Sequence, residues 1–244
     1  MTVLGIDTAT TTASVALVNE GSLILEETYP SPAQSGKFPL TSNRANHAEI
    51  VLPLVEGLLK RSGLTLPELS ALAVSIGPGS FTGLRIGLST VKGLAYGWNV
   101  PVVGVSTLFA MAARVTDWDG LICPFLDARK MEVYAALLFK KAESLERLTE
   151  DVVSSPNRII QHIQSINGQK PCLFIGDGTR VYGDLIKKGL GDQAILSLGE
   201  SFTSTAAAVA RLGEGRVLKN ESDPLGSLAP VYLRPSEAEL KKGV

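Results

Sequence analysis

The first 28 residues contain three strand-like runs, the first of them apolar, separated by short polar turns, and this pattern restricts how the chain can begin to fold. The runs cover residues 2–6, 12–18 and 22–28, and a short Asn-Glu-Gly connection at 19–21 joins the second run to the third. Asn and Gly in such a connection favour a hairpin turn. The sequence therefore predicts an antiparallel meander of three strands.

Helical and strand patterns alternate after the meander. Apolar residues at helical spacing predict a helix that follows Asn46, with Asn46 as its N-cap, Glu49 completing a capping box and Pro53 kinking or starting its regular part. A strand at 71–76, a helix near 82–97 and a strand at 101–105 follow. In the remainder we expect helices near 106–115, 156–165, 179–188 and 204–217, and strands near 120–126, 131–139, 171–175 and 194–198.

Mixed strands and helices in two successive blocks predict a two-lobed α/β protein. We place the first lobe at residues 1–105 and a reduced second lobe at 106–244, with a C-terminal tail able to pack back on the first. The net charge is −1 and the 23 Lys and Arg are scattered. The chain alone is therefore a poor candidate for tight RNA binding, which needs many clustered cations.

The start of the chain lacks the pattern of a signal peptide, and no apolar run reaches the roughly 20 residues of a membrane span. The two cysteines, Cys123 and Cys172, stand in separate apolar runs. Such isolated thiols indicate a structural role in a reducing compartment. We therefore expect a soluble cytoplasmic protein.

The glycine-rich segment 77–87 is the most unusual part of the sequence. It is not a Walker phosphate loop, because Thr82 stands where the second glycine should be and no lysine follows. A helix start capped by Ser80 or Thr82 could attract an anion. We favour the alternative that Gly83 and Gly87 form a smooth face on which another helix packs closely.

Two other turns could contact a phosphate. Asp7, Thr8 and Thr10 lie in a Thr-rich turn that offers hydroxyls and amides, with Asp7 able to hold a metal-bound water; the alternative is a turn satisfied by its own hydrogen bonds. Gly176 lies between a strand and a helix start, in either a tight connection or a phosphate contact. Asp127 and Arg129 form a polar turn that either faces a cleft or is a charged hairpin.

Metal and nucleophile chemistry find little support in the sequence. The two histidines, His47 and His162, are far apart, and Val51 stands four residues after His47, so a two-His helical ligand pair is missing. Neither histidine belongs to a recognisable catalytic triad motif. We expect His47 at the surface or in an interface.

Several motifs, taken in order, resemble the TsaB family, the dimerisation subunit of the bacterial tRNA threonylcarbamoyladenosine complex. They span nearly the whole chain, and segment 77–87 is the most specific of them. They are Ile6-Asp7-Thr8-Ala9, Asn46-His47-Ala48-Glu49 with Leu52-Pro53, residues 77–87 (Gly-Pro-Gly-Ser-Phe-Thr-Gly-Leu-Arg-Ile-Gly), Asp127-Ala128-Arg129, Gly176-Asp177-Gly178 and Pro230-Val231-Tyr232-Leu233-Arg234.

The resemblance implies an actin-like ATPase fold (ASKHA, ribonuclease H-like) of two lobes and a non-catalytic role. It implies pairing with the related catalytic subunit TsaD, cooperation with the ATPase TsaE, and contact with tRNA through the complex. ATP and metal would then be used by the partner subunits, with no cofactor held tightly by this chain. The catalytic partner's metal-binding His-x-x-x-His pair is missing here, which agrees with that role.

The resemblance and the helical patterns together indicate a partner-binding surface on the first two helices, which would also form a symmetric homodimer when the chain is alone. Asp7, Thr8, Thr10 and Gly176 become candidates for a vestigial nucleotide site, and no catalytic or metal-binding residue is expected. An ATP-dependent small-molecule kinase of the same fold is the main alternative, ahead of a peptidase. The partner-binding candidates are His47, Ile50, Val51, Leu54, Val55, Leu58, Gly83, Arg85, Gly87 and Val91.

Overall fold

The computed structural model describes residues 1–29, 47–166, 168, 170–197 and 205–234. The chain forms two compact units: Met1–Ala110 with Thr203–Val231, and Met111–Phe202 with Tyr232–Val244. The predicted α/β class is confirmed. The boundary proposed at 105 lies a few residues before the change of unit, and Thr203–Val231 belongs to the first unit.

The first unit is built on a five-stranded sheet in the order β3-β2-β1-β4-β5. The first three strands pair antiparallel, so the predicted meander is confirmed. The last two run parallel to β1, as connections through helices require. The strands are β1 (Thr2–Asp7), β2 (Ala13–Asn19), β3 (Ser22–Tyr29), β4 (Ala71–Gly77) and β5 (Val102–Ser106).

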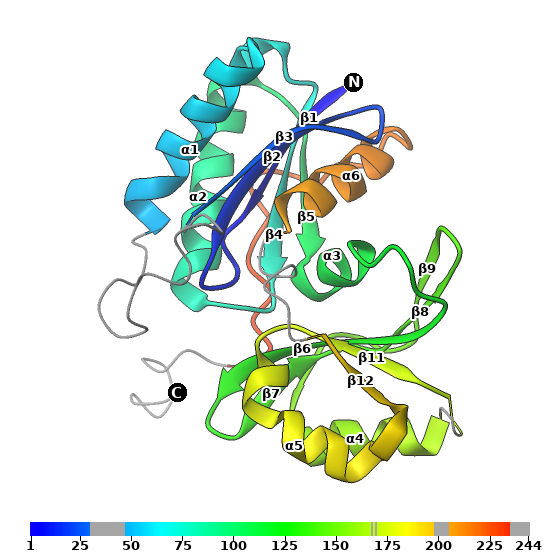
Figure 1. The fold of residues 1–244 in the computed structure, drawn as a ribbon. Helices are drawn as coiled ribbons and strands as arrows, with labels where there is room; N and C mark the ends of the chain where they lie inside the picture. Colours follow the sequence, from blue (N-terminus) through cyan, green and yellow to red (C-terminus); the bar gives the residue numbers. More distant parts are fainter. Residues whose placement is uncertain (30–46, 167, 169, 198–204, 235–244) are drawn as a thin grey trace. The chain divides into compact units, whose positions relative to one another are not determined.

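Helices cover both faces of this sheet (Figure 1). The helices α1 (His47–Ser62) and α2 (Phe81–Trp98) pack together on one face, and α6 (Ala206–Val217) packs on the other. Successive residues of β4 reveal the two faces, because Val74 lies beside α2 and Ala73 beside α6. Pro53 lies inside α1, so the helix does not begin there; the predicted cap Asn46 lies outside the described residues.

The second unit contains a seven-stranded sheet in the order β10-β7-β6-β11-β12, with β8 paired to β6 and β9. The helices α4 (Pro156–Ile166) and α5 (Gly178–Leu190) pack together, and the short α3 (Thr107–Ala113) follows β5. Among the described residues, no helix is long and apolar enough to span a membrane. The strands are β6 (Gly120–Arg129), β7 (Glu132–Ala135), β8 (Leu138–Lys141), β9 (Ser144–Arg147), β10 (Val152–Ser154), β11 (Cys172–Ile175) and β12 (Ala194–Leu196); two 3-10 turns lie at Leu66–Glu68 and Gly191–Gln193.

The single strand expected at 131–139 is wrong, because the structure has two strands there, β7 and β8. Both pair antiparallel with β6 in one register, which places Pro124 of β6 opposite Ala136. Proline lacks the backbone N–H that would donate a hydrogen bond to the neighbouring strand. The neighbouring Leu137 N–H donates instead to Thr149 Oγ1 at 2.9 Å. The ladder is therefore interrupted, and β9 and β10, which the sequence did not reveal, follow the break.

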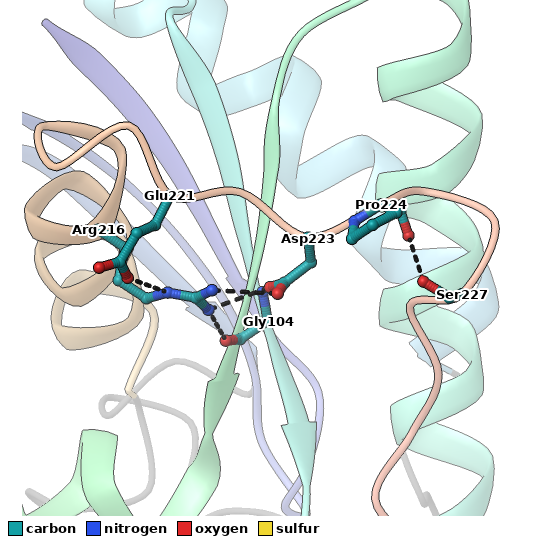
Figure 2. A network of polar contacts seen from close by, with 6 residues as sticks. All are labelled: Gly104, Arg216, Glu221, Asp223, Pro224 and Ser227. Atoms are coloured by element: carbon teal, nitrogen blue, oxygen red, sulfur yellow. Dashed lines mark hydrogen bonds and ion pairs between the residues drawn. The ribbon is translucent and has the colours of Figure 1, made fainter.

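A polar network fastens α6 and the segment after it to β5 (Figure 2). Arg216 donates to both carboxylate oxygens of Asp223 at 3.0 and 3.1 Å and to the Gly104 carbonyl at 3.1 Å. Asp223 Oδ2 also accepts from Gly104 N at 2.7 Å, and Asp223 N donates to the Val102 carbonyl at 2.8 Å. Bidentate Arg–carboxylate pairs fix geometry well, so this network sets the position of the returning chain.

Small residues let α6 approach the sheet closely. Ala16, Gly5 and Ala73 stand side by side on three neighbouring strands. A Cβ added at Gly5 would collide with Ala206 O and with Ala210 in α6, and a Cβ added at Gly213 would collide with Ala73. The contact between α6 and the sheet therefore depends on the absence of side-chain volume at Gly5.

We expect Gly5→Ala to destabilise the first unit by about 1–3 kcal/mol, the usual cost of overpacking a tight contact. Gly215→Ala is the matched control, because a Cβ at Gly215 meets open space and alanine is favoured in helices by up to about 1 kcal/mol. Thermal unfolding followed by circular dichroism should show a lower midpoint for the first variant and an equal or higher one for the second. Equal midpoints for Gly5→Ala and the unchanged protein would contradict the packing argument.

Candidate functional site

The loop after β1 and the glycine-rich segment form one closely packed unit. Ser80 N donates to the Ala9 carbonyl and Thr8 Oγ1 donates to the Gly83 carbonyl, each at 2.7 Å. A Cβ at Gly79 would collide with the Ala9 carbonyl, one at Gly83 with the Thr8 carbonyl, and one at Gly87 with the Thr8 hydroxyl. The glycines of this segment therefore permit close backbone approach within the chain.

This packing changes the interpretation of Gly83 and Gly87. Both were expected to offer a smooth face to a partner helix, but both are buried against Thr8, which explains their lack of a side chain. The predicted N-cap is confirmed, because Ser80 Oγ accepts from Gly83 N at 3.2 Å. The start of α2 is thus capped by the chain itself.

Asp7 is fully buried at the end of β1, and other groups occupy both of its carboxylate oxygens. Oδ1 accepts from Ala9 N at 3.0 Å, and Oδ2 accepts from Thr205 Oγ1 at 2.5 Å. Thr10 Oγ1 accepts from Thr12 N at 3.2 Å. Burial raises the pKa of Asp7, although the hydrogen bonds from Thr205 and Ala9 oppose this rise. The turn is therefore only partly satisfied by its own hydrogen bonds, as the alternative from the sequence had it, because Thr205 and Gly83 from distant segments bond Asp7 and Thr8.

His47 was expected at the surface or in an interface, but only 8% of it is exposed. Its side chain lies next to Gly83, where an added Cβ would be 3.2 Å from Nδ1. Burial lowers the pKa of His47, and the Thr11 backbone and the Asp7 carboxylate offset part of that shift. His47 therefore belongs to the packing around the β1 loop.

The other α1 candidates divide into two groups. Val51, Val55 and Leu58 are buried in the hydrophobic core of the first unit and cannot contact a partner in this conformation. Ile50 and Leu54 are half-buried, so each keeps some surface. Among the large hydrophobic side chains of α1, Leu52 is exposed, with 53% of its surface free.

The α2 candidates divide in the same way. Val91 is buried in the core. Arg85 is exposed, and its guanidinium lies 3.9 Å from the centre of the Phe81 ring. Gly93 and Gly97 were not among the residues predicted from the sequence; both are exposed, and a Cβ added at either would meet open space. Their spacing of four residues repeats that of Gly83 and Gly87. The spacing is visible in the sequence, but the sequence does not show which pair of glycines faces outward.

In the second unit, the structure brings together two motifs that the sequence analysis treated separately. Asp127 N donates to Asp177 Oδ1 at 3.0 Å, and Arg129 N donates to Asp127 Oδ1 at 2.9 Å. A Cβ at Gly176 or at Gly178 would lie 2.7 Å from the Phe125 carbonyl. Gly176 also has a φ of +109°, which other residues rarely adopt. These glycines therefore let the start of α5 pack tightly on β6.

Within the part of the chain that the structure describes, no group of three or more His, Cys, Asp and Glu side chains could hold a metal ion. His47 and His162 lie in different units. Cys123 and Cys172 are buried, and burial raises the pKa of both thiols well above the usual value. Buried thiols of this kind are inert, in agreement with the structural role expected for them.

Comparison with known proteins identifies the family. Residues 24–242 match the family model described as TsaD, tRNA N6-adenosine threonylcarbamoyltransferase. The tRNA threonylcarbamoyladenosine biosynthesis protein TsaB of Bacillus subtilis is 32% identical over 243 residues, covering 99% of this chain and 97% of the relative. The chain belongs to the TsaB family.

Solved structures agree with this assignment. YeaZ from Pseudomonas aeruginosa superposes with a TM-score of 0.76 at 26% identity, covering 95% of this chain and 99% of that one. The ROK hexokinase of Thermus thermophilus shares the fold alone, with a TM-score of 0.50 at 10% identity over 89% of this chain and all of that one. The actin-like ATPase fold expected from the resemblance is confirmed. Relatives that match nearly the whole of this chain are named for tRNA threonylcarbamoyladenosine biosynthesis.

We expect Asp7→Asn to stabilise the first unit at neutral pH. Asparagine can keep the bond from Ala9 N through its oxygen and replace the bond from Thr205 by a reversed one, in which its amide donates to the Thr205 hydroxyl oxygen, without a buried charge. Because folding raises the pKa of Asp7, the ionised carboxylate costs stability above that folded value, and the cost disappears below the unfolded value of about 3.9. Thermal midpoints between pH 4 and pH 8 should show a gain that grows as pH rises and then levels off.

Asp223→Asn is the matched control for this prediction. It removes a carboxylate that Arg216 holds in a bidentate pair, so it should lower the midpoint at neutral pH. If Asp7→Asn lowered the midpoint at every pH, the ionised carboxylate would be stabilising and the argument from burial would be wrong.

Proposed function

We propose that this chain is a non-catalytic subunit required for threonylcarbamoyl transfer to the adenosine beside the anticodon of tRNA. It acts by pairing with the catalytic subunit TsaD through the outer surface of α1 and α2. The match of most of the chain to the TsaD family model supports a partner of the same fold. Two chains with related surfaces can pair through equivalent helices, as subunits do across a two-fold axis.

The observation that carries the proposal is the apolar, glycine-containing outer surface of these two helices, formed by Leu52, Gly93 and Gly97. Leu52 lies on the side of α1 turned toward α2. Arg61 pairs with Glu27 of β3, and Leu52 stands about half a turn around the helix from Arg61. On α2, Gly93 lies about 200° from the buried Val91. Gly93 therefore points away from the core, and the proposed surface combines the outer sides of the two helices.

Gly93 and Gly97 lower the stability of α2, and no contact within the described part of the chain explains why glycine stands at these two positions. Glycine inside a helix is less stable than alanine by about 1 kcal/mol. Gly83 and Gly87 offset that cost through their contact with Thr8, whereas a Cβ at Gly93 or Gly97 would meet nothing within 4 Å. A partner helix that packs closely on α2 would explain these glycines, because small residues permit two helix backbones to come near each other.

The energetics require more than one contact. Full burial of an aliphatic side chain such as Leu52 contributes about 1.5–3 kcal/mol, whereas association costs about 4–15 kcal/mol. The partner must therefore cover both helices, including Tyr96 of α2, which is 86% exposed; Ile50 and Leu54 lie on the same side of α1 as Arg61, away from Leu52. The same surface would pair two copies of the isolated chain as a symmetric homodimer.

The lack of catalysis rests on the interior of the site. Asp7 is fully buried and each of its oxygens already accepts a hydrogen bond, from Ala9 N and from the Thr205 hydroxyl, so a metal-bound water would have to enter a site closed to solvent. TsaD and TsaE then supply the metal and the ATP chemistry, and tRNA is reached through the complex. The rival function, a small-molecule kinase, requires tight ATP binding by the lone chain, which calorimetry can measure.

The deciding experiment is modification of tRNA by purified TsaD, TsaE and the enzyme that supplies the threonylcarbamoyl adenylate, with and without this chain. We expect modification only when the chain is present. Undiminished modification without it, or turnover of a substrate by the chain alone, would sink the proposal.

We expect Gly93→Arg to abolish pairing with TsaD and tRNA modification while leaving the thermal midpoint unchanged or higher. The arginine enters open space on an exposed helix and improves helix propensity, but it blocks close approach of a partner. Gly215→Arg on α6 is the matched control, because it places the same side chain in open space on the opposite face of the sheet. Light scattering of the isolated chain and of the mixture with TsaD gives the readout; normal pairing by Gly93→Arg would contradict the proposed surface.

A further inference from the structure

A hollow of about 320 Å³ lies in the second unit between α4 and the edge of the sheet. Its walls are mainly apolar, with Ala135 and Leu137 from the β7 side and Ile159 from α4. All three side chains belong to the hydrophobic core. The volume lies at the lower end of the roughly 300–1,000 Å³ of small-molecule pockets.

The sheet register explains why the core opens to solvent here. Val152 of β10 stands opposite Ala135 of β7, so both side chains point to the face that α4 covers. Ala135 is buried, but 37% of Val152 is exposed. The apolar surface therefore continues past the edge of α4, and an apolar ligand can extend it without moving the backbone.

Two nitrogen-bearing side chains border the hollow on the same side of α4. Arg158 and His162 are four residues apart, which places them next to each other on the helix. Both are exposed, and neither side chain makes a hydrogen bond or ion pair with any residue that the structure describes. The lining contains no Asp or Glu. Arg158 also lies in the first turn of α4, where the helix dipole favours an anion.

We propose that this hollow binds a small monocarboxylate with a short apolar tail. The tail lies against Ala135, Val152 and Ile159, and the carboxylate accepts hydrogen bonds from the Arg158 guanidinium and from His162. Guanidinium–carboxylate pairs are stronger and more directional than neutral hydrogen bonds, so the charged end fixes the ligand's orientation. The pocket belongs to the second unit alone and is independent of the pairing surface on α1 and α2.

Hexanoate is the probe, and the methyl resonances of Ala135, Val152 and Ile159 in the full chain are the readout. We expect saturable shifts of these methyl groups with hexanoate, and at least tenfold weaker binding of 1-hexanol and hexylamine, which have the same tail without the carboxylate. Arg158→Gln should weaken hexanoate about tenfold and leave hexanol unchanged. Lys188→Gln, which removes a positive charge from an exposed position on α5, should change the binding of neither hexanoate nor hexanol.

A second variant keeps the test independent of charge. Ser154→Leu adds an apolar side chain to the lining and should abolish the shifts from both hexanoate and hexanol, with a normal far-UV spectrum. Shifts that do not saturate, equal binding of hexanoate and hexanol, or full binding to Arg158→Gln would each overturn the proposal. Because tRNA modification is not part of the readout, failure here leaves the proposed pairing with TsaD untouched.

Discussion

The contact between the β1 loop and the first turns of α2 fixes much of the first unit. Thr8 and Ala9 lie directly against Gly79, Gly83 and Gly87, and the Thr8 hydroxyl donates to the Gly83 carbonyl. A helix held so closely cannot rotate about its axis without a collision. The buried side of α2 therefore decides which residues remain outside, and the exposure of the later glycines follows from the packing of the earlier ones.

The two faces of the first sheet are built on different principles. Ile6 and Val74 belong to the bulky aliphatic core beneath α1 and α2, whereas Gly5 and Ala73 leave the other face almost flat for α6. Bulky side chains supply apolar burial, and small ones supply close approach of backbones. Asp7, at the end of β1, then connects to the start of α6 through Thr205. Each strand thus serves both layers through alternate residues.

Periodicity in the sequence predicts elements well but says little about what they touch. The meander, the helices and the cap at Ser80 follow from local patterns and are confirmed. The break between β7 and β8 depends on Pro124 in another strand, so no pattern within 131–139 could reveal it. Likewise, glycine spacing indicates close approach, but only the fold shows that Gly83 meets Thr8 and that Gly93 meets open space. The hydrogen bond from Asp127 to Asp177 joins distant parts of the chain and is invisible locally.

The position of α6 has a consequence for synthesis on the ribosome. This helix covers a sheet whose five strands are all complete by Ser106, yet it emerges only after Met111–Phe202, the larger part of the second unit. Until then, the Gly and Ala face of the sheet lacks its covering layer, and the nascent first half exposes it to other chains or to chaperones. Completion of the first unit must therefore wait until most of the chain has been translated, although domains generally fold in order from the N-terminus.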